Sequence, residues 1–367
     1  MQGNYNRNMM EESVRQVCYT VRIGYEKECC FMAMNRREFI GRASVAAVGG
    51  VSSLSAVGSS ACMNTFPILS GREFKGLEGA IAPIFTPYGK DGSVNGDMVG
   101  RMVEFLIGKG ISGFYVGGGT GEHVLLSVNE RKYLVESVIR AVARRAKVIV
   151  HVGCTYTEDS VALAKHAEKS GADWIASLGP LVFGQNFEAS YYHYSRIANA
   201  TSLPLMIYCW YRDLDPERER KFFDIPNLKG LKYTGHNFWA VQELRRMLDK
   251  EAVFFVGDDP HLLGGLSMNG VFSGGIGTTY NVIPEKFVRI CDLAKSGRFV
   301  EASPVQDCAN RIVSLLSRSN NFSFRKLAMK LHGFDCGFAR SPFGYPVSDV
   351  ECTAFLRELE AMLTETE

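Results

Sequence analysis

From residue 76 onward, short runs of apolar and often β-branched residues alternate with longer stretches whose apolar positions recur at helical spacing. The short runs are predicted strands, at residues 79–87, 113–118, 147–154, 173–179, 204–210, 228–234, 252–257 and 270–276. Helical patterns between them include residues 130–145, 158–169, 187–200 and 237–249. Strands that alternate with helices are typical of a parallel sheet with crossover helices. Because there are eight such strands, the pattern predicts the α/β class and a (β/α)8 TIM barrel.

Four more helical patterns follow the last predicted strand, at residues 285–296, 300–317, 324–332 and 349–363. The helix at residues 285–296 completes the alternation of strands and helices, and the three helices after it form an appendage. We therefore expect the barrel at residues 76–296 and a C-terminal helical extension at residues 297–367. Within the barrel, Ser127 and Glu130 predict a capping box at the start of one helix.

Residues 1–75 lack this alternation and form an N-terminal extension. Arg36 and Arg37 precede a weakly apolar, small-residue run at 43–57, which is the layout of a twin-arginine export signal. That run is too short and too rich in Gly and Ser for a stable transmembrane helix. Cys62 follows it and either becomes a lipidated first residue or lies near a plain signal-peptidase cut. We expect an exported protein, periplasmic or anchored by the Cys62 lipid at the periplasmic face of a membrane.

The charge and cysteine patterns narrow the classes of partner. The formal net charge is only +2, from 41 basic and 39 acidic residues, so no extended field of one sign is available to hold nucleic acid. The ten cysteines do not fall into the paired spacings of a zinc site or a disulfide framework. We therefore predict a small-molecule substrate and no metal site.

A glycine-rich turn, GGGTGE at residues 117–122, follows the second predicted strand. A dinucleotide-binding turn would place a third glycine at the phosphate and start a close-packed helix, and neither pattern is present. The backbone N–H groups around Gly119 and Thr120 are suited to a carboxylate instead, with the Thr120 hydroxyl as a further donor. A purely structural tight turn is the alternative.

Lys232 lies in the apolar centre of the sixth predicted strand. Strand alternation turns Leu231 and Tyr233 outward, toward the helices. It turns Lys232 and Thr234 inward, toward the C-terminal mouth of the barrel. Desolvation there would lower the pKa of Lys232 and leave a free amine that attacks a ketone carbonyl. The alternative is a lysine whose ammonium group reaches solvent at the strand end.

Other strand ends supply further candidates for the same mouth. Tyr208 ends the fifth strand, as a proton relay or as an ordinary core aromatic. Asp258 and Asp259 follow the seventh strand, as acceptors for sugar-type hydroxyls or as helix caps. A second glycine-rich loop, at residues 274–281, lets backbone approach a substrate. The expected substrate contacts are Gly119, Thr120, Thr234, Gly257, Asp259, Ile276 and Thr278.

Together these motifs resemble the dihydrodipicolinate synthase and N-acetylneuraminate lyase family of (β/α)8 enzymes, which act through a lysine Schiff base. The resemblance covers about residues 76–363 and rests on the order of the motifs at 117–122, 207–208, 230–232, 274–281 and 340–342. It implies that Lys232 forms an imine with pyruvate or another 2-oxo acid, and that Tyr208 relays protons. It also implies that Thr120 and neighbouring amides hold the carboxylate, that no cofactor is required, and that the chain forms a homotetramer or homodimer.

The residues before Thr120 and the aromatic Tyr233 look closer to the N-acetylneuraminate lyase branch. Some substrate-facing positions depart from the family. Gly119 stands where a hydroxyl residue is usual, and Val182 stands where the synthase branch has a tyrosine. Two other positions also depart from the family. Pro260 replaces an acidic sugar contact of the lyase branch, and Arg212 lies near, but not on, the position of the synthase carboxylate-binding arginine.

Three hypotheses follow. The leading one is cleavage or formation of a carbon–carbon bond in a sugar-like 2-oxo acid, with pyruvate as one partner and Lys232 as the imine-forming residue. The second is a synthase or dehydratase of the same family, acting on a different 2-oxo acid. The third is an exported protein that binds a 2-oxo acid or sugar without turnover. Gly119 and Val182 favour the third hypothesis, whereas the pair of Lys232 and Tyr208 disfavours it.

Overall fold

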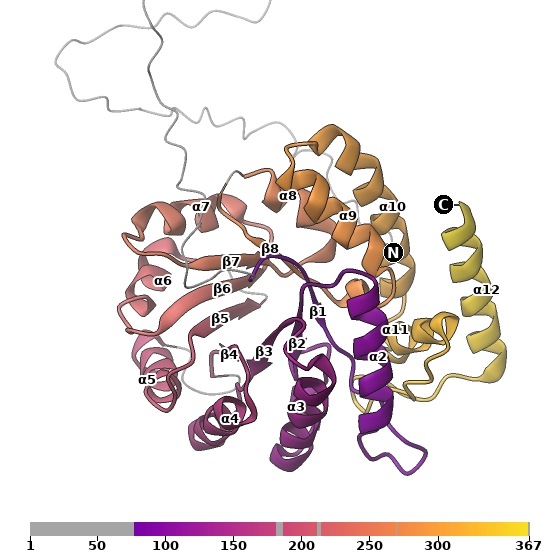
Figure 1. Ribbon diagram of the computed structural model, residues 1–367, viewed down its shortest axis with the longest axis horizontal. Helices are drawn as coiled ribbons and strands as arrows, with labels where there is room; N and C mark the ends of the chain where they lie inside the picture. The colour runs from indigo at the N-terminus through magenta and orange to yellow at the C-terminus, as the bar shows by residue number, and fades with distance from the viewer. Residues whose placement is uncertain (1–76, 181–185, 211–213, 269, 366–367) are drawn as a thin grey trace, which may run out of the picture. The chain divides into compact units, whose positions relative to one another are not determined.

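The computed structural model describes residues 77–180, 186–210, 214–268 and 270–365. Eight parallel strands pair in sequence order, and β8 pairs with β1 to close a barrel, as predicted (Figure 1). The strands are β1 (Gly79–Pro83), β2 (Gly113–Val116), β3 (Lys147–His151), β4 (Trp174–Leu178), β5 (Leu205–Trp210), β6 (Leu228–Thr234), β7 (Val253–Val256) and β8 (Gly274–Ile276). Most of them are shorter than the apolar runs. The runs at β1, β2, β3 and β7 continue into the loops at the barrel mouth, whereas β8 begins four residues later than predicted.

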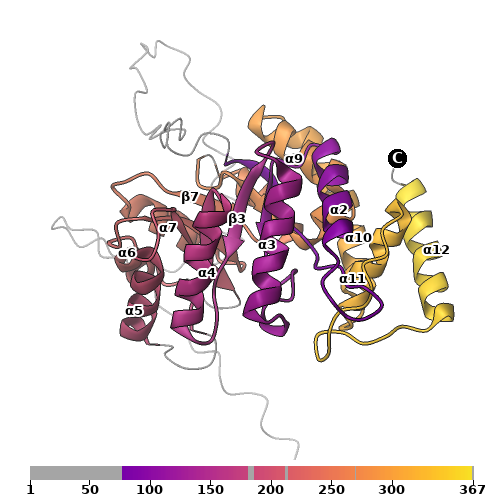
Figure 2. The ribbon, with the colours of Figure 1, turned by 60° about the horizontal axis from the view of Figure 1, so that its bottom comes forward.

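Helices surround the strands on the outside of the barrel (Figures 1 and 2). They are α2 (Gly96–Gly108), α3 (Val128–Val142), α4 (Thr157–Ser170), α5 (Phe187–Ala198), α6 (Pro216–Phe222), α7 (Phe238–Met247), α8 (Leu262–Leu266) and α9 (Pro284–Lys295). Three short 3-10 helices lie in the loops, namely η2 (His123–Leu125), η3 (Asp259–His261) and η4 (Thr278–Asn281). The predicted capping box at the start of α3 is confirmed, with reciprocal bonds between Ser127 and Glu130.

The C-terminal extension is helical, as predicted, and consists of α10 (Phe299–Ser317), α11 (Ser323–Leu327), η5 (Ala328–His332) and α12 (Asp349–Glu365). The single helix expected at residues 324–332 is divided into α11 and η5. In both views these helices lie on one side of the barrel, and α10 packs against α9 and η3 (Figures 1 and 2). The extension therefore reaches the loops at the barrel mouth.

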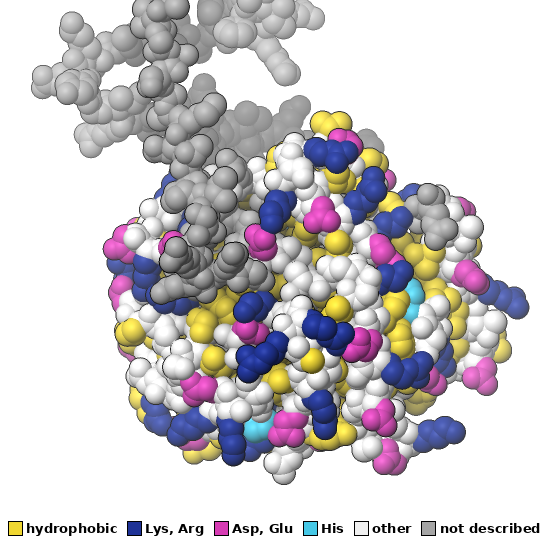
Figure 3. Space-filling model, viewed as in Figure 1, with side chains coloured by type: hydrophobic (Ala, Val, Ile, Leu, Met, Phe, Trp, Pro, Cys, Tyr) yellow, Lys and Arg dark blue, Asp and Glu magenta, His cyan; other side chains and the backbone are white. Residues whose placement is uncertain are grey.

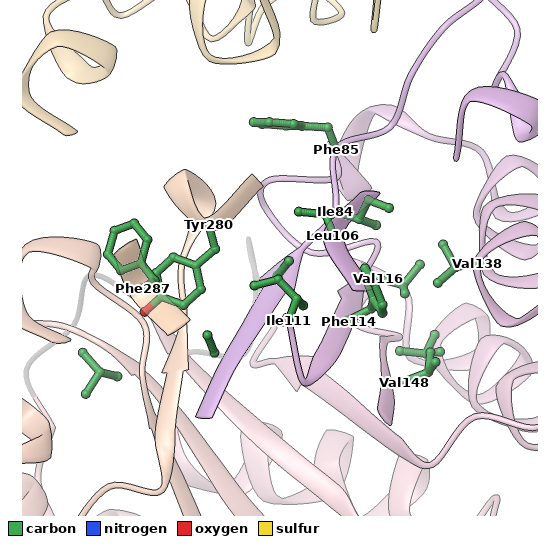
Figure 4. Close-up of a cluster of buried hydrophobic side chains, with 14 of the residues drawn as sticks. Ile84, Phe85, Leu106, Ile111, Phe114, Val116, Val138, Val148, Tyr280 and Phe287 are labelled. Atoms are coloured by element: carbon green, nitrogen blue, oxygen red, sulfur yellow. The ribbon is translucent and has the colours of Figure 1, made fainter. Parts of the chain in front are cut away.

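Two clusters of buried side chains form the core. One lies between the strands and the surrounding helices, where Phe114 and Val116 face Val138 of α3 (Figure 4). The other fills the barrel interior and includes Ile81, Tyr115, Ile149, Trp174, Met206, Phe255 and Ile276. Burial of each large apolar side chain stabilises the fold by about 1.5–3 kcal/mol. Because side chains fill the interior, a substrate of the barrel is expected at its mouth.

The described surface mixes both signs of charge. On the face shown in Figure 3, Lys and Arg side chains are interspersed with Asp and Glu side chains. No helix in the described part of the chain is both long and apolar enough to cross a membrane. The export signal predicted at Arg36 and Arg37 lies outside the described residues, as do Cys62, Val182 and Arg212.

Candidate active site

A cavity of about 400 Å³ opens at the ends of β5, β6, β7 and β8. The structure brings every predicted site residue to its wall: Gly119, Thr120, Tyr208, Lys232, Thr234, Gly257, Asp259, Ile276 and Thr278. These residues come from five separate strand ends, which parallel strands collect at one end of a barrel.

Lys232 lies on β6 with its side chain inside the barrel, and only 4% of the residue is exposed. Its neighbours Leu231 and Tyr233 pack outward in the cluster beneath the helices, as alternation predicted. Burial lowers the pKa of the Lys232 amine to about 7, although the nearby charge of Asp259 opposes that shift. The alternative of a lysine reaching solvent is therefore wrong, and a large share of the amine is uncharged at neutral pH.

Two tyrosine rings flank the Lys232 amine. Its Nζ lies 4.1 Å from the ring centre of Tyr208 and 4.7 Å from that of Tyr115. Tyr208 is the direct partner of Lys232 in the register between β5 and β6, so adjacent strands place phenol and amine together. The Tyr208 ring also stacks on Trp210, at 6.0 Å between ring centres. The strand register and the stacking on Trp210 thus keep the Tyr208 ring beside the amine, where a proton relay must lie.

The glycine-rich turn after β2 meets the loop after β8. The hydroxyls of Thr120 and Thr278 lie 2.7 Å apart, within hydrogen-bond distance. The Thr86 hydroxyl donates to the carbonyl of Gly121 over 2.8 Å and holds the turn from below. A Cβ added at Gly119 would meet its nearest neighbour, the ring of Trp210, only at 4.0 Å. The position therefore has room for the hydroxyl side chain that is usual there.

Asp259 is buried in the cavity wall, and its Oδ2 accepts a hydrogen bond from the Thr279 amide over 2.7 Å. Burial raises the pKa of this carboxyl, while the bonds from Thr279 and the charge of Lys232 oppose the rise. Asp258 occupies the cap position of η3, but its side chain makes no capping bond there. Asp258 is therefore not a helix cap, which was one of the two interpretations of its sequence position.

Gly257 allows the close approach of two strands at the amine. A Cβ added there would lie 2.0 Å from the Thr234 hydroxyl and 3.1 Å from Cε of Lys232. Distances below 3.0 Å are not observed for real Cβ atoms, so any side chain at this position would displace Thr234. Glycine at position 257 is thus a requirement of the site geometry.

Sequence reasoning missed several residues that surround the Lys232 amine or line the cavity. Tyr115 lies in the centre of β2, and Trp210 lies two positions after Tyr208 on the same strand face, so alternation could have identified both. Phe322 and Arg325, from the C-terminal extension, also line the cavity. No local pattern marks them, because their place depends on how the extension packs on the barrel.

Comparisons with known proteins agree with this geometry. Residues 76–362 match the Dihydrodipicolinate synthetase family. An N-acetylneuraminate lyase of Rhizobium meliloti is 32% identical over 275 residues, which are 73% of this chain and 89% of that protein. An N-acetylneuraminate lyase of Escherichia coli is 31% identical over 294 residues, which are 78% of this chain and 96% of that protein.

Solved structures give the same result. The wild-type Ruminococcus gnavus sialic acid aldolase has a TM-score of 0.75 at 26% identity, and the match covers 80% of this chain and 98% of that one. The N-acetylneuraminate lyase of Mycoplasma synoviae has a TM-score of 0.73 at 28% identity, with 79% and 99% covered. A further match is the Ruminococcus gnavus aldolase with its catalytic lysine mutated. The chain therefore belongs to the dihydrodipicolinate synthetase family and is a class I aldolase or lyase, which acts through a lysine Schiff base.

Proposed function

We propose that this protein cleaves or forms a carbon–carbon bond in a sugar-like 2-oxo acid, with pyruvate as one partner. The observation that carries the proposal is the Lys232 amine, buried between Tyr208 and Tyr115 with its pKa lowered to about 7. An uncharged amine at the mouth of the barrel can attack a ketone carbonyl. The relatives named N-acetylneuraminate lyase support the sugar-like substrate.

The reaction begins when the Lys232 nitrogen bonds to C2 of the 2-oxo acid, giving a carbinolamine that loses water to form an imine. Tyr208 moves the protons that these two steps require. The Tyr208 phenolate left by the loss of water then accepts the proton of the C4 hydroxyl. The bond between C3 and C4 breaks, its electron pair passes toward the imine nitrogen, and an aldehyde and an enamine result. Protonation of the enamine at C3 and hydrolysis of the imine release pyruvate and restore the amine.

The substrate carboxylate lies, in this proposal, against the turn after β2. Thr120 and the amide groups around Gly119 supply donors there, and Thr278 supports the Thr120 hydroxyl from across the cavity. Asp259 faces the same space and is suited to accept from a substrate hydroxyl. Other lining residues, such as Trp210 and Arg325, would contact the aldehyde half.

A synthase or dehydratase reaction is the second candidate. A solved dihydrodipicolinate synthase matches at a TM-score of 0.71 and 26% identity. Both reactions use the same imine, so they differ in the partner that reacts with the enamine. Release of an aldehyde from a sugar-like 2-oxo acid would support the lyase. If the protein instead condenses pyruvate with another partner and does not cleave sugar-like acids, the synthase is supported.

Borohydride trapping tests the shared step. The purified protein is incubated with pyruvate, reduced, and analysed by intact mass and peptide mapping. We expect a pyruvate-derived adduct on Lys232 that is lost in Lys232→Ala and kept in Lys229→Ala, a lysine three positions earlier on β6. If neither pyruvate nor longer 2-oxo acids leave an adduct, the lyase proposal is wrong and binding without turnover becomes the better account.

We also propose that the chain is exported through the twin-arginine route, on the sequence around Arg36 and Arg37. Replacement of both arginines by lysine should retain the protein inside the cell. Mass spectrometry of the mature N-terminus separates lipidation of Cys62 from a plain cleavage. Light scattering of the purified protein tests the homotetramer or homodimer that the family resemblance implies.

A further inference from the structure

A second group of side chains with ligand chemistry lies beside the cavity. His236 follows β6, while Asp258 and His261 follow β7. The Nε2 atom of His236 lies 3.5 Å from Oδ2 of Asp258, and Nδ1 of His261 is hydrogen-bonded to the same oxygen. The two imidazole rings lie 5.0 Å apart between centres. Two loops thus bring two ring nitrogens to one carboxylate.

We propose that His236, Asp258 and His261 bind a divalent transition-metal ion of the zinc type at the rim of the active-site cavity. Their three ligand atoms all lie within 4.8 Å of one another. A zinc ion bound by nitrogen and oxygen ligands at 2.0–2.2 Å holds those atoms roughly 3.3 Å apart in tetrahedral geometry. The three side chains therefore need only small rotations to surround an ion, which would replace the hydrogen bond between His261 and Asp258.

The ligand types favour a particular class of ion. Two imidazole nitrogens and one carboxylate oxygen suit zinc and its neighbours in the transition series. Magnesium and calcium prefer shells made of oxygen alone. The cluster contributes little to the stability of the fold, because contacts among partly exposed polar side chains are worth only about 0–1 kcal/mol. Nor does the Asp258 carboxylate serve η3, since it makes no capping bond to that helix.

The cluster adjoins the space where substrate is expected. Asp258 lines the same cavity as Lys232, and the next residue, Asp259, faces the amine. Three protein ligands leave one position of a zinc ion open. That position would take a hydroxyl or carbonyl oxygen of the aldehyde half, a role that rests on the proposed function. The sequence predicted no metal site, because these histidines belong to different loops and show no ligand spacing.

Direct binding to the full chain tests the inference. The protein is prepared without a histidine tag, freed of metal with a chelator, and titrated calorimetrically with Zn²⁺ and separately with Mg²⁺. We expect one Zn²⁺ per chain and no saturable binding of Mg²⁺. His236→Ala and His261→Ala should each weaken Zn²⁺ binding at least ~10-fold, since even the removal of groups that only orient ligands costs about that factor.

His166→Ala is the matched control, because His166 also pairs with a carboxylate, Glu136, at 2.8 Å, but lies on α4. It should keep full Zn²⁺ affinity, and thermal melting should show that all three variants are folded. Co²⁺ substitution identifies the ligands, because a site of nitrogen and oxygen lacks the thiolate charge-transfer band that cysteine ligands would give.

Absence of saturable Zn²⁺ binding would overturn the inference, as would binding that survives both His236→Ala and His261→Ala. A thiolate band in the Co²⁺ protein would assign the ion to cysteines and also overturn it. Zn²⁺ binding is measured without substrate, and imine trapping at Lys232 is measured without metal. Failure of the metal site can therefore be told apart from failure of the proposed function.

Discussion

The Lys326 ammonium donates a hydrogen bond to Oε1 of Glu122 over 2.9 Å, and both side chains are fully buried. Glu122 ends the turn that carries Thr120, while Lys326 lies on α11 in the C-terminal extension. The other carboxylate oxygen of Glu122 accepts from the Arg340 amide over 2.7 Å. The extension therefore holds the turn on which the substrate carboxylate is expected to lie.

Removal of one partner of this pair should destabilise the protein strongly. Lys326→Met leaves the Glu122 carboxylate buried without its cation, which typically costs about 3–5 kcal/mol. The double variant Glu122→Gln, Lys326→Met should be more stable than the sum of the two single changes predicts. Urea unfolding of all four proteins measures the coupling. If each single variant loses less than about 1 kcal/mol of unfolding free energy and the two losses add in the double variant, the pair does not tie the extension to the turn.

The pKa of Lys232 makes a prediction about stability and pH. That pKa is about 7 in the folded protein and about 10.4 in an unfolded chain, so the unfolded state binds more protons between these values. Stability should therefore rise with pH there, by up to about 1.4 kcal/mol per unit from this group. Lys232→Met should be more stable than the natural protein at pH 7, and the difference should shrink toward pH 9.5. A constant difference in unfolding free energy would contradict the lowered pKa.

Two tyrosines face the Lys232 amine, and they should differ in function. The Tyr115 hydroxyl is buried and has no hydrogen-bond partner among the described residues, so Tyr115→Phe should keep most activity and stability. Tyr208→Phe should lower kcat about 100-fold or more, because it removes the proposed relay and leaves the ring. Steady-state kinetics with the 2-oxo acid substrate compares the two variants. Equal losses would assign the relay to neither residue alone.

Two glycines of the cavity wall form a matched pair. At Gly119 a side chain meets its nearest neighbour at 4.0 Å, so Gly119→Ser should fold normally and bind pyruvate more tightly through the added hydroxyl. At Gly257 the same change should displace Thr234 and cost about 1–3 kcal/mol through overpacking. Trapping by borohydride at Lys232 should survive in the first variant and fall sharply in the second. Normal trapping in Gly257→Ser would mean that this glycine is dispensable.

Strand and helix positions in the barrel were predictable because each element has a local signal. Leu231 and Tyr233 alternate with Lys232 and Thr234, and that alternation alone assigned the inward face of β6. The capping box at Ser127 was equally local. Strand boundaries were less accurate, since several apolar runs continue into the loops at the barrel mouth and the run before β8 starts four residues before that strand.

The barrel, its helical extension and the group of side chains at the mouth could be predicted from the amino-acid sequence, because strand period and glycine-rich turns are properties of neighbouring residues. What surrounds those side chains depends on how distant parts of the chain pack together. Burial of Lys232 between two tyrosine rings depends on adjacent strands in register. The contact of Lys326 with Glu122, like the meeting of His236 with Asp258, joins loops or helices that no local pattern relates. Such contacts depend on the packing of the whole chain, and they set the charge and the shape of the site.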